Sequence, residues 1–325
     1  MGNGALPAVV RLTRLHALLV AGALGIAPAL QAQTPTGQAV ERAQLLRNEP
    51  ALRDDSSPSS SSSDEERAPE SPNDPDLGEQ AILKRQEAYR PFSVSASLPI
   101  FYTTNVALSR NHERGDAIFA PAVGFTYAPK LTPTLYATFS VGQQEFYYDR
   151  FDGLDFGSFD ARAGLTYTLP KLHDLSLHAE YAYNRLTASN SFDDFFSSHG
   201  LGFNADLPFR IGRAQQVSVG LDANLNIHSE PSEPGRHDFG AYVGYSVNLT
   251  RALTLNAVGR LAVRDYTDTD RVDVSEVFSL AATYRLSKWF SLAATTTLAH
   301  NDSNHDVFNY DVANIGGALA FSYRF

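Results

Sequence analysis

The chain has 325 residues, which is enough for one large β domain or two ordinary ones. It carries a net charge of −10, it has no cysteine, and its single methionine is the first residue. This composition argues against non-specific binding of nucleic acid, against a disulfide framework and against a thiolate metal site.

Residues 1–32 have the order of a secretory signal peptide. Arg11 and Arg14 precede an apolar run over residues 15–26, and small residues follow as far as Ala32. A positive segment, a short apolar core and a small-residue cleavage site are the parts of such a peptide. The apolar run is shorter than the ~20 residues of a membrane-spanning helix. We therefore expect residues 1–32 to be an export signal that is cleaved after Ala32.

Residues 33–91 have a different composition. A serine run over residues 56–63 leads into acidic residues and then into a Pro, Asp and Asn cluster that ends at Asp76. A segment with few apolar groups and many charges gains too little from burial to offset its chain entropy. We predict a disordered periplasmic extension, in which residues 37–52 and 77–89 have the composition of short helices. A simple tether is one interpretation, and a barrel plug or a partner-docking segment is the other.

From residue 92 onward, apolar residues alternate with small or polar ones. An apolar residue at every second position predicts a strand with one apolar face. The 15 Tyr and 20 Phe of the chain also suit strands. Twelve such stretches occur, at residues 92–100, 119–127, 135–141, 159–169, 175–183, 201–207, 217–227, 239–249, 253–263, 278–286, 290–298 and 315–325. Residues 92–325 are therefore predicted to form one all-β domain.

The connections between these stretches alternate in length. Those after every even-numbered stretch are tight, for example residues 250–252, whereas most others are longer and acidic, for example residues 147–157 and 300–311. Outer-membrane barrels have short periplasmic turns and longer outer loops. We therefore predict an antiparallel up-and-down transmembrane β-barrel of about twelve strands in the bacterial outer membrane, with both termini in the periplasm.

The last strand ends the chain on its apolar face, which carries Phe321, Tyr323 and Phe325. Chain ends are usually frayed and polar. In a bacterial barrel, however, the last strand closes against the first and places aromatic residues at the lipid–water boundary. The ending resembles the signal by which the outer-membrane assembly machinery recognises its clients. The expected partners are that machinery, outer-membrane lipid and lipopolysaccharide.

The barrel region resembles the outer-membrane β-barrel porin family of bacteria, a broad and poorly characterised group. The resemblance lies in residues 121–129 (PAVGFTYAP), 145–150 (EFYYDR) and 314–325 (NIGGALAFSYRF). It implies a porin-like architecture for the barrel and does not cover the serine-rich segment. Because the shared motifs are architectural, no functional residue carries over.

The inward face of the predicted barrel carries the charges. Twelve strands leave a restricted lumen between them unless a segment plugs it. We expect the arginines of the later strands and the acids of the middle strands to line roughly opposite walls, with one exception, Arg162. The alternative is a lumen closed by arginine–acid pairs. The candidate pore-lining residues are Asp160, Arg162, Glu180, Asp206, Asp222, Tyr242, Arg260, Arg264, Arg285 and Arg324.

One stretch invites a catalytic interpretation. His300 and Ser303 resemble the His-x-Ser-Asn-Gly pattern of outer-membrane phospholipases, which also have twelve strands. Here the two residues are three apart, which on a strand puts them on opposite faces, and no glycine follows Asn304. We expect this segment to be a polar outer loop. No catalytic residue and no cofactor are predicted. No metal site is predicted either, because the acidic loops lack the spacing of a calcium site.

The sequence therefore predicts a porin-like channel for passive diffusion of small hydrophilic solutes, and no enzyme. The alternative is a non-conducting barrel that anchors or docks periplasmic partners through residues 33–91. Lipase activity is a remote third possibility.

Overall fold

The computed structural model describes residues 35–47, 89–189, 191 and 193–325, which belong to one compact unit, Gln33–Phe325. The predicted signal peptide and the serine-rich segment lie outside the described residues. Within the described part, no helix has both the length and the apolar character needed to cross a membrane. The elements are α1 (Pro35–Arg47), β1 (Phe92–Thr103), β2 (Asp116–Phe119), β3 (Ala122–Tyr127), β4 (Leu135–Tyr148), β5 (Phe156–Leu169), β6 (Leu175–Ala188), β7 (Asp194–Ile211), β8 (Gln215–Glu230), β9 (Arg236–Asn248), β10 (Leu253–Tyr266), β11 (Val272–Arg285), β12 (Phe290–Ser303) and β13 (Tyr310–Arg324), with short 3₁₀ helices at Asp152–Leu154, Pro170–Leu172 and Asp306–Phe308.

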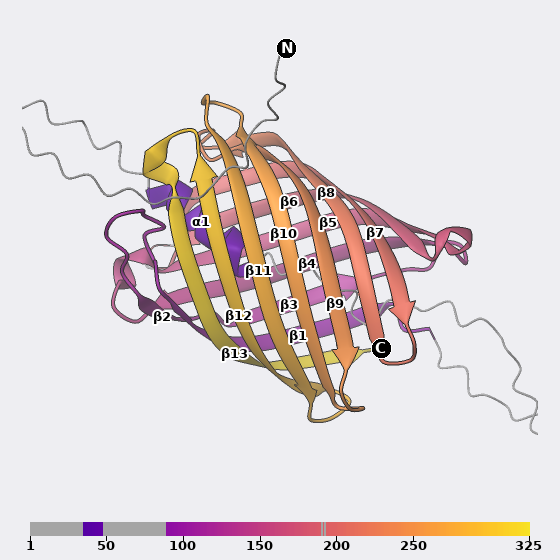
Figure 1. Cartoon of the computed structure of the whole chain (residues 1–325). Coiled ribbons are helices and arrows are strands. Elements are labelled where there is room, and N and C mark those ends of the chain that lie inside the picture. The colour runs from indigo at the N-terminus through magenta and orange to yellow at the C-terminus, as the bar shows by residue number, and fades with distance from the viewer. Residues whose placement is uncertain (1–34, 48–88, 190, 192) are drawn as a thin grey trace, which may run out of the picture. The chain divides into compact units, whose positions relative to one another are not determined.

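The strands form a closed antiparallel barrel (Figure 1). From β4 onward each strand pairs with the next along the chain, and β13 pairs with β1. Strands β2 and β3 both pair with β1 on one side and with β4 on the other, so they are two halves of one barrel strand. The barrel therefore has twelve strand positions, and the predicted up-and-down topology and strand number are confirmed.

The break between β2 and β3 lies at Ala120 and Pro121. Proline has no N–H group to donate to a neighbouring strand, so regular pairing stops there. The wall stays closed because Ala120 N–H donates to the Pro99 carbonyl at 2.9 Å and Glu145 N–H donates to the Pro121 carbonyl at 3.0 Å. The interruption is a local kink in a continuous wall.

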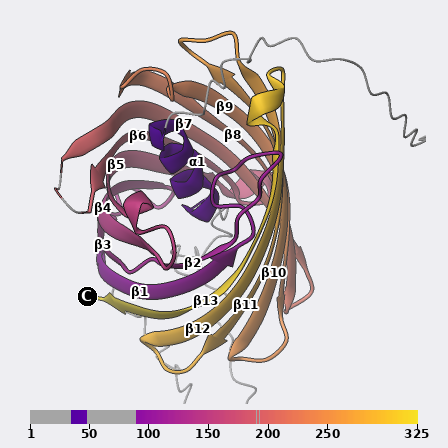
Figure 2. The ribbon, with the colours of Figure 1, turned by 90° about the vertical axis from the view of Figure 1, so that its left-hand side faces the viewer.

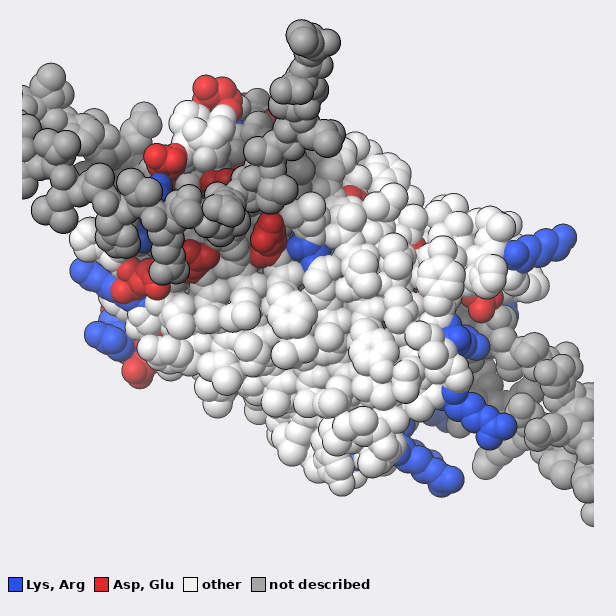
Figure 3. Space-filling model, in the orientation of Figure 1, with Lys and Arg blue, Asp and Glu red and all other residues white. Residues whose placement is uncertain are grey.

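The predicted alternation of faces is clear in β11. Val274, Phe278 and Leu280 are exposed on the outer surface, whereas Asp273 and Ser275, on the opposite face, are buried. Figure 3 shows the result on one face of the barrel, where a broad uncharged band separates charged side chains near the two ends. An apolar outer band is what a barrel presents to lipid.

The two ends of the barrel differ. The loop end carries the connections 104–115, 149–155, 189–193, 231–235, 267–271 and 304–309, and the turn end carries 128–134, 170–174, 212–214, 249–252 and 286–289 together with the carboxyl terminus. Several strands run further toward the loop end than predicted, and β12 continues through Ser303. The reason is that polar residues beyond the apolar band still pair across strands, as His300 does with Asp311.

Helix α1 lies inside the ring of strands, at the loop end (Figure 2). Its Ala39, Val40 and Ala43 belong to one buried cluster with residues of β2, β4, β5, β6 and β7. Leu45 belongs to a second cluster with Tyr310 and neighbouring wall residues. A helix buried on several sides lies in a core and not on a surface. Residues 35–47, which belong to the segment predicted to be a disordered periplasmic extension, therefore form a helix that packs against the inner wall.

The closing contact joins the first and last strands at the turn end. Phe92 N–H donates to the Phe325 carbonyl at 3.2 Å, and Phe325 N–H donates to the Phe92 carbonyl at 3.0 Å. The two rings stack with centroids 5.6 Å apart, and Tyr323 stacks on Phe325 at 6.0 Å. The predicted assembly residues therefore lie at the closing pair, while their recognition by the assembly machinery stays a prediction.

We predict that Phe325→Ser lowers the amount of folded barrel in the outer membrane. The substitution removes the closing aromatic contact. It also removes the terminal aromatic residue that, in the assembly hypothesis, is recognised before the barrel folds. The measurement is heat-modifiable migration of the membrane fraction on gels. Tyr284→Ser is the matched control, because Tyr284 is similarly exposed near the turn end but lies on β11. Equal loss in the two variants would contradict a special role for the last residue.

Candidate functional site

The loop end of the inner wall contains a cluster of buried charges, which we call the arginine cluster. Strand pairing places Arg264 of β10 beside both Asp238 of β9 and Asp273 of β11. Arg236 forms an ion pair with Asp238, Nε to Oδ1, at 2.9 Å. Arg271, just before β11, donates from Nε to both oxygens of Asp273, at 2.9 and 3.1 Å. The wall thus holds three arginines and two carboxylates in one buried site.

Helix α1 adds a third carboxylate. Glu41 Oε1 accepts hydrogen bonds from Tyr266 Oη and from Arg271 Nη2, each at 2.8 Å. The same oxygen lies 3.8 Å from Nη1 of Arg236. The other terminal nitrogen of Arg236, Nη2, donates to Gln44 of α1. With Glu41 in place, the cluster has three positive and three negative groups. The helix is therefore held by polar contacts that also neutralise the wall.

Aromatic rings fix the guanidinium of Arg271. Its Cζ lies 4.1 Å from the ring centroid of Tyr266 and 3.7 Å from that of Phe308. Cations are attracted to the faces of aromatic rings, and more strongly where water is excluded. Burial alone would lower the pKa of Arg271, but its hydrogen bond to Asp273 and the charge of Glu41 outweigh burial and raise it. Arg271 therefore stays charged and rigidly placed.

Arg264 is the least satisfied member of the cluster. Its Nη1 donates to Asn301 Oδ1 at 3.2 Å and to Tyr310 Oη at 3.5 Å. Its Nε and Nη2 have no hydrogen-bond partner among the described residues, although the residue is only 1% exposed. A buried donor without a partner is costly. The site therefore has hydrogen-bonding capacity that Glu41 does not use.

Further down the wall, polar side chains pair across an intervening strand. Arg260 of β10 donates to both oxygens of Asp222 of β8, at 3.2 and 2.5 Å. The strand between them presents Gly240, where a Cβ atom would lie 2.6 Å from Asp222 Oδ1 and 2.8 Å from Arg260 Nη2. Tyr242 likewise passes over Gly220 to donate to Asp206 Oδ1 at 2.7 Å. The glycines make room for these bridges.

A third polar group lies on β5 and β6. Arg162 donates to Glu180 at 3.1 Å and lies 4.0 Å from Asp160. His178 is 3.1 Å from the other oxygen of Glu180. The Arg162 side chain is 46% exposed although it belongs to the inner face, whereas the Arg236 side chain of the arginine cluster is 3% exposed. The lumen is therefore open to solvent at the level of Arg162 and closed at the arginine cluster.

The expected separation of charges onto opposite walls is wrong. Asp222 and Arg260, which were expected on opposite walls, form a direct pair. Arg162, the expected exception, pairs with acids of its own and the next strand. The expectation failed because a long side chain can reach the second strand away where the strand between them presents a glycine, as Arg260 reaches Asp222 over Gly240. Of the other candidates, Arg264 joins the buried cluster, while Arg285 and Arg324 lie at the turn end, where the Arg324 carbonyl accepts a hydrogen bond from Arg90 at 3.3 Å.

Several site residues were missed from the sequence. The predicted strand ranges leave Arg236, Arg271 and Asp273 in loops, and Glu41 belongs to the extension 33–91, which was predicted to be a tether or else a plug or partner-docking segment. Their spacing carried a signal, because Arg236 and Asp238, and Arg271 and Asp273, are each two residues apart beside a strand end. Two residues apart on a strand means one face. No comparable signal connects Glu41 with residues more than 190 positions away.

The catalytic interpretation finds no geometry to support it. His300 and Ser303 lie on β12 and not in a loop, with His300 exposed on the outer surface and Ser303 buried. The His300 ring nitrogen Nδ1 is 2.7 Å from Asp311 Oδ1, on the neighbouring strand. Within the described ranges, no three His, Asp or Glu side chains are grouped as metal ligands.

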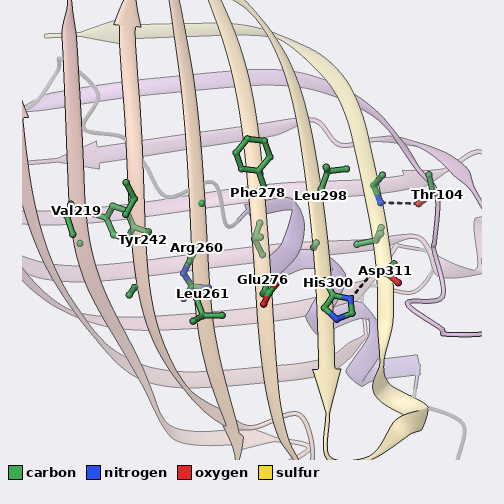
Figure 4. Close-up of a pocket in the computed structure, with 18 of the residues that line it drawn as sticks. Thr104, Val219, Tyr242, Arg260, Leu261, Glu276, Phe278, Leu298, His300 and Asp311 are labelled. Atoms are coloured by element: carbon green, nitrogen blue, oxygen red, sulfur yellow. Dashed lines mark hydrogen bonds and ion pairs between the residues drawn. The ribbon is translucent and has the colours of Figure 1, made fainter. Parts of the chain in front are cut away.

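A shallow depression of about 860 Å³ lies along the wall of strands β8–β13 (Figure 4). Its lining includes exposed apolar side chains, among them Leu221, Leu261 and Phe278, and the pair His300 and Asp311 lies toward the loop end. Exposed apolar groups on the outer face of a barrel contact lipid. The apolar side chains of its lining therefore face lipid, whereas Tyr242 and Arg260, which also line it, form the bridges of the inner wall.

The comparisons agree with this architecture. The sequence profile of the family described as "Putative beta-barrel porin 2" matches residues 188–322. Among solved structures, the chain is similar to an outer-membrane channel from Pseudomonas putida F1, with a TM-score of 0.52 and 12% identity over 74% of this chain and 97% of that chain. The translocator domain of the autotransporter NalP from Neisseria meningitidis gives 0.42 and 15% over 74% and 90%. No curated protein matches the chain at a significant level. The predicted resemblance to outer-membrane β-barrel porins is confirmed.

We predict that Gly240→Ala destabilises the barrel. The added Cβ would collide with the Asp222–Arg260 bridge, and disturbing a buried polar pair costs about 1–3 kcal/mol. The measurement is the urea dependence of unfolding in detergent or lipid. Gly259→Ala is the control, because nothing lies within 4 Å of its Cβ position. The control should leave stability unchanged or raise it by up to about 1 kcal/mol, and equal effects in both variants would contradict the bridge.

Proposed function

We propose that the protein is an outer-membrane channel for passive diffusion of small hydrophilic solutes, and that helix α1 closes its loop end. The observation that carries this proposal is the contrast along the lumen. The inner wall is polar and solvent-exposed at Arg162, and it is sealed at the arginine cluster by the helix.

The seal is close. One cavity between α1 and the wall, lined by Leu45, Leu108 and Val312 among others, has a volume of only about 10 Å³. That is room for about one water molecule. Because α1 also packs against wall residues on several sides, we infer that passage of a solute requires the helix to move.

Movement of the helix leaves the barrel intact. Among the described residues, the strands pair with one another, and α1 contributes no backbone hydrogen bond to the sheet. Its polar attachments include side-chain contacts of Glu41 and Gln44 with residues of β9, β10 and the end of loop 267–271. Arg42 of α1 also lies over the ring of Tyr148 on β4, with Cζ 5.6 Å from the ring centroid. The helix is thus a removable closure on a rigid frame.

The orientation follows from the general asymmetry of such barrels. Short turns face the periplasm and longer loops face outward. We therefore place the carboxyl terminus in the periplasm and α1 toward the outer surface. The amino terminus, also predicted to be periplasmic, lies outside the described residues.

The other functions find less support. Docking of periplasmic partners requires residues 33–91 to be available, yet most of α1 is buried against the wall. Lipase chemistry requires a histidine within reach of a serine hydroxyl, and His300 and Ser303 lie on opposite faces. Passive transport without an enzymatic step is the function that the geometry supports best.

We predict that deletion of residues 35–47 raises the conductance of the barrel. Without the helix, the loop end lacks its closure. The measurement is single-channel recording of purified protein in planar bilayers. A deletion of equal length, residues 56–68, is the control and should behave as the unaltered chain. Silent membranes containing folded deletion protein would rule out the channel, and unchanged conductance steps would rule out the closure.

A second prediction concerns ion preference. The substitution Arg162→Ser is made in the barrel that lacks residues 35–47. It removes a positive charge that is exposed in the lumen, so the ion selectivity of the channel should shift toward cations. A charge acts over about 8–10 Å at physiological salt, which is comparable with a narrow lumen. The measurement is the reversal potential in a salt gradient, with Arg251→Ser in the turn 249–252 as the control. An equal reversal potential in both variants would mean that Arg162 does not face the conducting path.

A further inference from the structure

The arginine cluster has the composition of an anion site that the helix occupies. Its wall groups are Arg236, Arg264 and Arg271 with Asp238 and Asp273, which leaves one positive charge in excess. Glu41 supplies the one negative charge that balances it. Without a carboxylate at this position, a buried guanidinium would lack its counter-charge, which is strongly unfavourable.

The site is preorganised by the wall. Asp238 holds Arg236, Asp273 holds Arg271, and the Tyr266 and Phe308 rings pack against the guanidinium of Arg271. None of these contacts involves the helix. A set of donors that is already fixed in place binds an anion without a large ordering cost. The donors therefore persist when Glu41 leaves.

Glu41 satisfies the site only in part. Its Oε1 accepts both hydrogen bonds described above, whereas its Oε2 has no partner among the described residues. On the wall, Nε and Nη2 of Arg264 also have none in that part of the chain. A guanidinium matches a carboxylate best when both oxygens are engaged. A carboxylate that is not tied to a helix could use the donors that Glu41 leaves over.

We infer that Arg236, Arg264, Arg271 and Tyr266 form a binding site for the carboxylate of a small hydrophilic solute, and that Glu41 fills this site when the solute is absent. The inference rests on the proposed channel function and names its solute class. A monocarboxylate is expected because the wall has a single charge in excess. Solute and helix compete for the same donors, so binding of one favours release of the other.

The test measures release of the helix and does not depend on conduction. The chain has no cysteine, so Ala43→Cys introduces a unique thiol on α1, at a position only 3% exposed. The rate of its reaction with a polar maleimide in proteoliposomes reports how often the helix leaves the wall. Sodium gluconate is the probe, and sodium chloride with glucose at equal ionic strength and osmolarity is the control.

Gluconate should raise the labelling rate in a saturable manner, by at least about fivefold, which is the lower end of usual coupling between two ligands. Chloride with glucose should not raise it. Equal acceleration by both solutions would show charge screening only and would overturn the site, as would no acceleration by either.

Two further variants of the Ala43→Cys protein separate the roles. Glu41→Gln should label quickly without gluconate, because the helix loses its ion pairs while the wall is unaltered. Arg271→Gln should also label quickly, but gluconate should have no further effect. Arg213→Gln, in the turn 212–214, is the matched control and should respond as the parent does. Folding of each variant is checked by heat-modifiable migration.

The outcomes distinguish this site from the channel itself. If the barrel stays silent in bilayers after deletion of residues 35–47 while the full chain shows gluconate-dependent labelling, the site is kept and the channel is rejected. A barrel that conducts after deletion of residues 35–47 but shows no effect of gluconate keeps the channel and rejects the site. If Arg271→Gln fails to fold, labelling of the Glu41→Gln variant still decides whether the ion pairs hold the helix.

Discussion

The structure depends on the pairing of β13 with β1. In hydrocarbon a strand cannot leave its N–H and C=O groups unpaired, so the sheet must close on itself. Eleven residue pairs, from Ser93 with Arg324 to Thr103 with Asn314, provide this closure. A barrel of twelve strands then has a lumen that wall side chains alone cannot fill along its whole length. The bridges over Gly220 and Gly240 narrow it at mid-height, and α1 fills it at the loop end.

Most of the fold could be predicted from the sequence because a period of two is hard to produce by any other structure. The strand ends could not. Residues 143–145, Gln-Gln-Glu, interrupt the apolar alternation, yet β4 continues through them to Tyr148 because they still pair with β5. Alternation reports contact with lipid, and pairing extends beyond the lipid. The interruption between β2 and β3 at Pro121 could not be predicted from the sequence either, because the apolar alternation continues across it.

The candidate site was predicted only in part, for a different physical reason. Position along a strand determines which face a side chain occupies, so Asp222 and Arg260 could be placed on the same face, where they form an ion pair. It does not determine what lies two strands away, which depends on whether the strand between presents a glycine. The contact of Glu41 with Arg271 is even harder to predict from the sequence. It joins residues 230 positions apart, and the strand pattern does not indicate where the helix lies.

The charge balance of the arginine cluster connects fold, closure and function. Strands β9–β11 and the loop before β11 fix three arginines and two acids in place, and the helix completes neutrality through Glu41. The measurement that tests this most directly is the swelling of proteoliposomes in a small neutral sugar. Because the sugar carries no charge, swelling reports the open path alone. We predict that Glu41→Gln protein swells faster than the unaltered protein. Equal swelling rates for the two folded proteins would contradict closure of the lumen by α1.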